Sequence, residues 1–469
     1  MLARATALLF LGLGMASCGT KEPGPEETVP RLDVLRERAW MLGVDARQRF
    51  LVFTSQTASG TYAQALPAGW VTRISEPAEG VRFAQDGSSV LLWSPVSGEQ
   101  TRTWWIWRPG TGAGVAFTSR ASGDMVHDRS LTYAAFTESE AGTTSLRVMD
   151  TATCTAEACP LRTLLQVPGN TLLLQGGGTA VLATDATQGW LIDVPSGAVT
   201  PLGPIAGPTT LSSDGTRYSL FDGAGHLQVF DTATRTLVWE RPWMEDVSLK
   251  DWKVSSALMT DAKVMVVNVY QPPPPGSIPL VRETLKCDAE ACQAVPGGAG
   301  ACWWGLDRTD AVHCNRTVRC GPYGCEYQDV YYDASMRLLS NTGYRGSFSR
   351  QPAFNADLTQ HLWLDRGTSS DTLTWNRPEG SRQLALQGRV ETNLCAFLPG
   401  GERVAFAQAL TRSDGVSETR LWAWDGETVT NLLPLENAPT SPFVVRDSPT
   451  ALYVNVAAPD HTNIIRIGL

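Results

Sequence analysis

The chain of 469 residues lacks any sustained helical periodicity after residue 30. Its apolar residues alternate with polar ones or stand in short blocks, as in Val264-Met-Val-Val-Asn-Val and Arg403-Val-Ala-Phe-Ala. Gly and Pro are spread along the sequence, as expected for a chain that turns every dozen residues. These patterns exclude helical folds and indicate an all-β protein.

The chain also lacks an excess of basic residues and the common catalytic motifs. Its formal net charge is −9 and its pI is near 5.2, which argues against nucleic acid or anionic lipid headgroups as partners. There is no G-x-S-x-G, H-E-x-x-H, P-loop or G-x-G-x-x-G after a strand. We therefore predict no catalytic residues and no cofactor.

Residues 1–17 have the features of an export signal. Arg4 precedes an apolar run over residues 5–14, which is too short for a membrane-spanning helix of about 20 residues. The ending Met15-Ala16-Ser17-Cys18 resembles the lipobox of bacterial lipoproteins, with Met15 in place of the usual Leu. The resemblance implies a lipidated Cys18 and, since Gly19 is not Asp, the outer membrane. The charged and Pro-containing composition after Cys18 indicates an exposed tether over residues 18–30. An ordinary secreted protein remains the alternative.

A turn followed by an apolar strand recurs ten times, most clearly at Phe83-Ala-Gln-Asp86-Gly87 and Leu211-Ser-Ser-Asp214-Gly215. The other eight copies centre on Asp45, Asp128, Gly177, Asp261, Asp307, Asp357, Gly400 and Asp447. The nine intervals between the first and last copies average about 45 residues, the length of a propeller blade. Residues 31–469 are therefore expected to form a β-propeller.

Each repeat divides into four strands, which we name a to d. In the second unit these are expected over residues 80–84, 90–94, 103–107 and 114–118. The last unit has only three, and residues 31–36 are well suited to supply its fourth strand and close the ring. Ten repeats exceed the four to eight blades of most single propellers. We favour one ring of eight to ten blades. Two propellers, or repeats that are insertions, remain alternatives.

The turns resemble those of TolB-like propellers, whose signature is Phe-Ser-Pro-Asp-Gly before an apolar strand. The two clearest copies match best, together with Phe354-Asn-Ala-Asp357 and Phe397-Leu-Pro-Gly400-Gly401. None is complete, so the resemblance extends to the wider, WD-repeat-like propeller group. It implies an extracytoplasmic scaffold for protein contacts.

Eight of the ten cysteines are expected to form four disulfides. Three pairs have the spacing C-x4-C and fall at hairpin turns, and a fourth pair faces across strands a and b of one repeat. The pairs are Cys154 with Cys159, Cys287 with Cys292, Cys320 with Cys325, and Cys302 with Cys314. Zinc sites usually use C-x2-C, so we predict no metal. Cys395 is expected to be a buried thiol.

The five histidines give no further sign of a metal or acid-base site. Each lies in a different repeat, and no two have helical or hairpin spacing. They are His127, His226, His313, His361 and His461.

Three long loops are expected to share one face over neighbouring blades. Two are b-to-c loops and one is a d-to-a connection. The patch comprises Trp243, Trp252, Pro272, Pro273, Pro274, Pro275 and Tyr323. We predict that it contacts a partner, with tolerated insertions as the alternative. Most other tryptophans lie in strands, where packing between blades explains them.

The preferred function is a membrane-anchored extracytoplasmic lipoprotein whose propeller binds an envelope protein or surface ligand without catalysis. It would belong to the outer membrane and face the periplasm or the exterior. A glycan hydrolase or lyase with carboxylates in the central channel is the alternative. A purely structural surface protein is a third possibility.

Overall fold

The computed structural model describes residues 32–45, 47–98, 101–120, 125–155, 157–169, 172–222, 224–243, 252–272, 282–295, 300–305, 308–321, 324–341, 353–355, 357–366, 370–387, 389–398, 400–411, 417–433, 438–444, 451–457 and 460–468. Regular structure in these ranges is β-strand, apart from one 3-10 turn, η1 (Thr151–Thr153).

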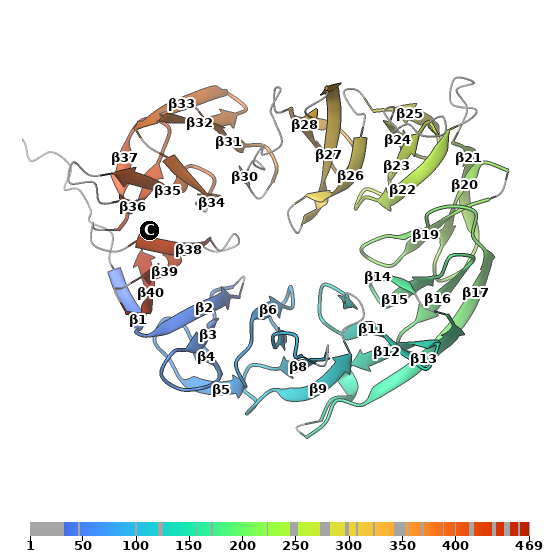
Figure 1. Ribbon diagram of the computed structural model, residues 1–469, viewed down its shortest axis with the longest axis horizontal. Helices are drawn as coiled ribbons and strands as arrows, with labels where there is room; N and C mark the ends of the chain where they lie inside the picture. Colours follow the sequence, from blue (N-terminus) through green and yellow to red (C-terminus); the bar gives the residue numbers. More distant parts are fainter. Residues whose placement is uncertain are drawn as a thin grey trace, which may run out of the picture.

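Ten four-stranded antiparallel sheets form one closed ring, a ten-bladed β-propeller (Figure 1). In blades 1 to 9 the strands follow chain order, and the first strand lies nearest the ring centre. The ten counted repeats are thus ten blades, and the alternatives of two propellers and of inserted units are wrong.

The first five blades contain strands β2 to β21. They are β2 (Ala39–Val44), β3 (Phe50–Ser55), β4 (Thr61–Ala65), β5 (Val71–Ser75); β6 (Gly80–Phe83), β7 (Val90–Trp93), β8 (Thr101–Trp107), β9 (Val115–Arg120); β10 (Val126–His127), β11 (Tyr133–Glu140), β12 (Thr143–Asp150), β13 (Leu161–Pro168); β14 (Leu173–Gly177), β15 (Ala180–Thr184), β16 (Gln188–Asp193), β17 (Ala198–Pro204); and β18 (Thr210–Leu211), β19 (Arg217–Phe221), β20 (His226–Asp231), β21 (Leu237–Pro242).

The remaining blades contain strands β22 to β40 together with β1. They are β22 (Lys253–Met259), β23 (Met265–Tyr270), β24 (Arg282–Cys287), β25 (Cys292–Ala294); β26 (Gly300–Gly305), β27 (Arg308–Gly321), β28 (Gly324–Asp333), β29 (Leu338–Asn341); β30 (Ala353–Phe354), β31 (His361–Arg366), β32 (Ser370–Arg377), β33 (Gly380–Gln387); β34 (Arg389–Phe397), β35 (Val404–Thr411), β36 (Ser417–Trp424), β37 (Val429–Asn431); and β38 (Ala438–Val444), β39 (Ala451–Ala457), β40 (Thr462–Gly468), β1 (Leu32–Arg36).

The ring closes through a strand from the beginning of the chain, as the sequence predicts. β1 pairs antiparallel with β40 and becomes the outer strand of blade 10. Leu32 lies opposite Ile467, and Nη1 of Arg466 is 3.2 Å from Oδ2 of Asp33. Each end of the propeller thus supplies part of the same sheet.

The recurring turns join strands a and b, but their aspartates occupy two different positions. Asp45 and Asp128 come first in their turns, are buried, and accept hydrogen bonds from backbone N–H groups four and five residues later. Asp86, Asp214 and Asp357 lie two residues further into the turn and accept from the N–H two residues later. The Asp307 and Asp447 turns lie outside the described residues.

The core is divided into clusters that lie between blades rather than inside one sheet. One cluster joins Trp375 of blade 8 to Phe406 and Trp424 of blade 9, and the ring centroids of the two tryptophans are 5.7 Å apart. Every one of the nine clusters in the described residues combines adjacent blades. Several strand tryptophans therefore pack between blades, as expected: Trp104, Trp105, Trp107, Trp375 and Trp424. Cys395, predicted to be buried, is half-buried at the edge of the cluster that contains Trp375 and Trp424.

Three of the four predicted disulfides are present. They join Cys154 to Cys159, Cys287 to Cys292 and Cys302 to Cys314. Cys320 and Cys325 lie opposite each other in the β27–β28 register, but their side chains are outside the described residues.

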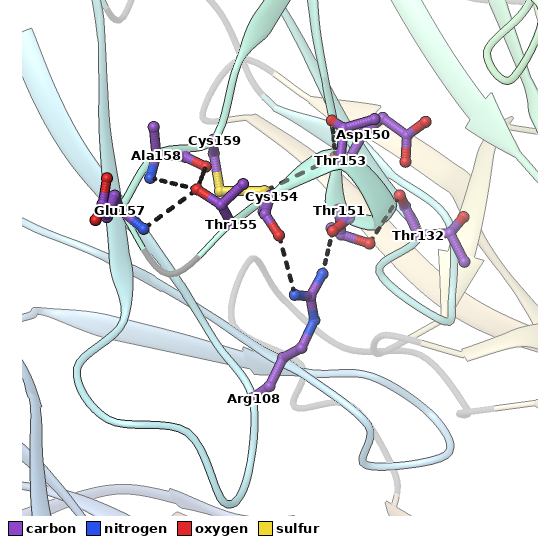
Figure 2. Close-up of a disulfide and its surroundings, with 10 residues drawn as sticks. All are labelled: Arg108, Thr132, Asp150, Thr151, Thr153, Cys154, Thr155, Glu157, Ala158 and Cys159. Atoms are coloured by element: carbon purple, nitrogen blue, oxygen red, sulfur yellow. Dashed lines mark hydrogen bonds between the residues drawn. A yellow bond between two sulfur atoms is a disulfide. The ribbon is translucent and has the colours of Figure 1, made fainter.

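The first disulfide closes a turn that also binds the neighbouring blade. Arg108, which follows β8 of blade 2, donates from its guanidinium to the carbonyl oxygens of Thr151 and Cys154 in blade 3 (Figure 2). The hydroxyl of Thr151 donates to the carbonyl of Thr132 at 3.0 Å. Arginine and disulfide together hold the c-to-d turn of blade 3 against blade 2.

Candidate functional site

A pocket of about 440 Å³ lies between blades 5 and 6. Four aromatic side chains and two charged ones contribute to its lining: Phe221, Trp243, Trp252, Tyr270, Asp222 and Lys253. They come from the end of β19 and the b-to-c turn that follows it, from the d-to-a connection between the blades, and from the ends of β22 and β23. The volume is within the range of small-ligand and side-chain sites.

The structure thus brings together part of the predicted patch. Trp243 and Trp252 are nine residues apart in the chain, yet both line this pocket. Pro272 is half-buried, two residues after Tyr270. Pro273, Pro274, Pro275 and Tyr323 lie outside the described residues.

The two tryptophans differ in burial. The Trp243 side chain is 6% exposed and belongs to the core between blades 5 and 6, whereas Trp252 is half-buried against that core. The backbone N–H of Trp243 also donates to the carbonyl of Gly225 at 3.2 Å. Trp243 therefore forms a fixed wall rather than an exposed contact. Trp252 lies at the edge of this core, so its replacement disturbs the core less than replacement of Trp243 would.

The b-to-c turn of blade 5 is shaped by Asp222. Its Oδ1 accepts hydrogen bonds from the backbone N–H groups of Ala224 at 2.9 Å and His226 at 2.7 Å. Such local bonds are why Asp favours turns. They leave Oδ2 for other partners.

That second oxygen belongs to a cluster of three ionisable side chains. Nδ1 of His226 lies 2.9 Å from Oδ2 of Asp222 and 3.5 Å from Oε1 of Glu240. The hydrogen bond with Asp222 raises the pKa of His226 above its usual value. The backbone N–H of His226, followed by its imidazole, lowers the pKa of Asp222. The cluster adjoins the pocket, because Asp222 belongs to both.

Sequence reasoning missed this cluster because it considered the histidines one at a time. The signal was the spacing of His226 and Gln228 on one face of β20, with Glu240 opposite Gln228 on β21. Asp222 lies four residues before His226, across a tight turn. Only the hairpin register shows that all three side chains meet.

The alternative function, a glycan hydrolase or lyase, would need a carboxyl group whose pKa is raised so that it can act as an acid. Among the described residues, every Asp with a resolved shift has a lowered pKa: Asp86, Asp185, Asp214, Asp222, Asp231, Asp357, Asp425 and Asp460. For Asp214, burial opposes ionisation, but hydrogen bonds from Lys263, Ser212 and Thr216 outweigh it. These carboxylates stabilise turns and blade contacts.

In the part of the chain that the structure describes, no helix has the length and apolar character needed to cross a membrane.

No protein-family model matches the chain, and no curated protein matches it significantly. Solved structures with a similar fold include the eukaryotic initiation factor, with a TM-score of 0.44 and 11% identity over 85% of this chain and 89% of that one. TolB from Acinetobacter baumannii has a TM-score of 0.27 and 14% identity over 65% and 81% of the two chains. The WD40 domain of SCAP from fission yeast has a TM-score of 0.36 and 7% identity over 94% of this chain and 98% of that one. These likenesses concern the fold alone.

Proposed function

We propose that this protein is a bacterial envelope lipoprotein whose propeller is a non-catalytic scaffold, and that it binds a peptide segment of a partner protein in the pocket between blades 5 and 6. The observation that carries the proposal is the pocket itself. Aromatic side chains from two blades surround a concave space, and a carboxylate and an ammonium group lie at the same site.

The chemistry of the lining favours a peptide. Trp252 and Tyr270 are half-buried and offer rigid aromatic contact area for an apolar side chain. Such anchors provide most of the energy at protein interfaces. Asp222 accepts hydrogen bonds and Lys253 donates them, so the two match the N–H and C=O groups of a peptide backbone. The size of the pocket suits one or two side chains.

Replacing Trp252 tests the proposed recognition. Trp252→Ala should lower the yield of a crosslinked envelope partner at least about tenfold, because an interface tryptophan is commonly an energetic hot spot. Trp70→Ala is the matched control: Trp70 is 47% exposed and lies in the c-to-d turn of blade 1, at the opposite face from the pocket. Equal capture by the wild type and both variants would contradict the proposal. Trp243→Ala is unsuitable because it would remove a core side chain.

Membrane attachment through Cys18 is a separate part of the proposal, and it rests on residues outside those the structure describes. Cys18→Ala should abolish incorporation of labelled palmitate and move the protein from the membrane fraction to the soluble fraction, because each buried CH₂ of an acyl chain contributes about 0.8 kcal/mol to attachment. Residues 19–469 stay unchanged, so folding is unaffected. Membrane association that persists in Cys18→Ala would contradict a lipid anchor.

A further inference from the structure

The cluster of Asp222, His226 and Glu240 contains the ligand set of a transition-metal site. It combines one imidazole nitrogen with two carboxylates, and the three candidate ligand atoms lie within 4.8 Å of one another. A purely acidic surface cluster would suit hard cations such as Ca²⁺ or Mg²⁺. An imidazole nitrogen placed between the carboxylates shifts the preference toward Zn²⁺ and similar ions.

The separations agree with coordination of one ion. Around a tetrahedral Zn²⁺ with bonds of about 2.0–2.2 Å, neighbouring ligand atoms are about 3.3 Å apart. Nδ1 of His226 lies 2.9 Å from Oδ2 of Asp222 and 3.5 Å from Oε1 of Glu240. Small side-chain rotations would bring these atoms to metal-bonding distance.

The outer oxygens of both carboxylates are already held by other donors. Oδ1 of Asp222 accepts the two backbone bonds of its turn, and Oε2 of Glu240 accepts from Nε2 of Gln228 at 3.3 Å. Metal-binding carboxylates are commonly oriented in this way by a second set of hydrogen bonds. The remaining oxygens are the two that face His226.

The burial of the three residues also suits an ion. Their side chains are 30–38% exposed, so the ion can enter from solvent and keep water as a further ligand. Asp222 also lines the neighbouring pocket, which places the cluster at its border.

We propose that Asp222, His226 and Glu240 bind one divalent transition-metal ion, of which Zn²⁺ is the best match, at the border of the pocket between blades 5 and 6. The site needs neutral imidazole, so binding Zn²⁺ displaces the proton that His226 shares with the carboxylates. The site shares Asp222 with the proposed peptide recognition, but Zn²⁺ binding can be tested without the peptide.

The chain offers a matched control in His461. Its Nδ1 also pairs with an aspartate, Asp460, whose other oxygen lies 2.9 Å from Nη2 of Arg38. Among the described residues no second carboxylate joins this pair in a three-ligand cluster. His461 thus has the same pair without the third ligand.

The test is titration of tag-free, disulfide-intact protein with ZnCl₂ by calorimetry, with bound metal counted after dialysis. We expect one equivalent of Zn²⁺ in the wild type and in His461→Ala. Altering only the groups that hydrogen-bond to a metal's ligands costs about 10–100-fold in affinity, so removal of a ligand itself in His226→Ala or Glu240→Gln should cost at least about a hundredfold. Circular dichroism of each variant checks that it is folded.

Two results would overturn the proposal. One is the absence of saturable Zn²⁺ binding by the folded wild type. The other is a Zn²⁺ affinity that is the same in His226→Ala as in the wild type, together with Ca²⁺ or Mg²⁺ binding as tight as Zn²⁺ binding. That result would show that only the carboxylates hold the ion. Both results would leave the peptide-recognition test with Trp252→Ala untouched.

Discussion

Deletion of residues 1–36 should lower the free energy of unfolding by on the order of 5 kcal/mol and cause self-association. The deletion removes β1, whose Leu32 packs against the core between blades 9 and 10. Leu35 likewise packs against the core between blades 10 and 1. Loss of two leucine contacts and of the β1–β40 ladder leaves β40 as an exposed edge, and blade 10 then meets blade 1 through packing against β2 and β3.

Chemical denaturation and analytical ultracentrifugation measure the two effects. A deletion of residues 1–31 is the matched control, because it retains the whole of β1 (Leu32–Arg36). If β1 holds the ring together, the two truncated proteins should differ clearly in stability and in monomer content. Equal stability and equal monomer content would show that β1 does not hold the ring together.

Gly215→Ala should cost about 2–5 kcal/mol, from left-handed backbone strain together with overpacking. Gly215 has φ +71°, and a Cβ there would lie 2.0 Å from the carbonyl oxygen of Gly177 in the adjacent blade. Because the obstacle is backbone, no side chain can rotate away. The turn must move, which breaks the 3.3 Å bond from the N–H of Gly178 to the carbonyl of Ser213.

Gly142→Ala separates strain from packing. Gly142 has a similar φ of +79°, but a Cβ there would meet nothing within 4 Å. This variant should cost only about 1–2 kcal/mol, the penalty of a left-handed residue. Thermal and urea unfolding of the two variants give the comparison. If both lose the same stability, the close contact between the turns of blades 4 and 5 contributes nothing.

The strands were predictable because their signals are local. In the second repeat the expected ranges 80–84, 90–94, 103–107 and 114–118 differ from β6, β7, β8 and β9 by no more than two residues at either end. Alternating apolar residues and Gly-containing turns determine these positions without reference to distant contacts. The closing role of β1 followed from the three-stranded last repeat by the same reasoning.

The recurring turn was only partly understood from the sequence. The repeat pattern predicts that Asp45 and Asp214 are equivalent. In the structure Asp45 instead occupies the position that Ser212 takes in the turn of blade 5. Both residues accept a backbone N–H at the end of the turn, so different side chains serve one purpose. A pattern of residue types cannot distinguish the two positions, because Asp suits both.

The candidate site depended on contacts that local patterns do not contain. The order of strands predicts that Trp243 and Trp252 share one face, and both residues line the pocket between blades 5 and 6. The burial of Trp243 was not predictable, because it results from packing between blades 5 and 6. The meeting of Asp222, His226 and Glu240 likewise depends on the hairpin register.

The most direct test of the proposed function is photo-crosslinking from within the pocket. A photoreactive amino acid at position 252 should link the protein to one defined envelope partner in intact cells, through a specific peptide segment that mass spectrometry can map. The same amino acid at position 70 should give no such product. Crosslinking of the same partner from both positions, or of no partner from position 252, would contradict recognition at this pocket.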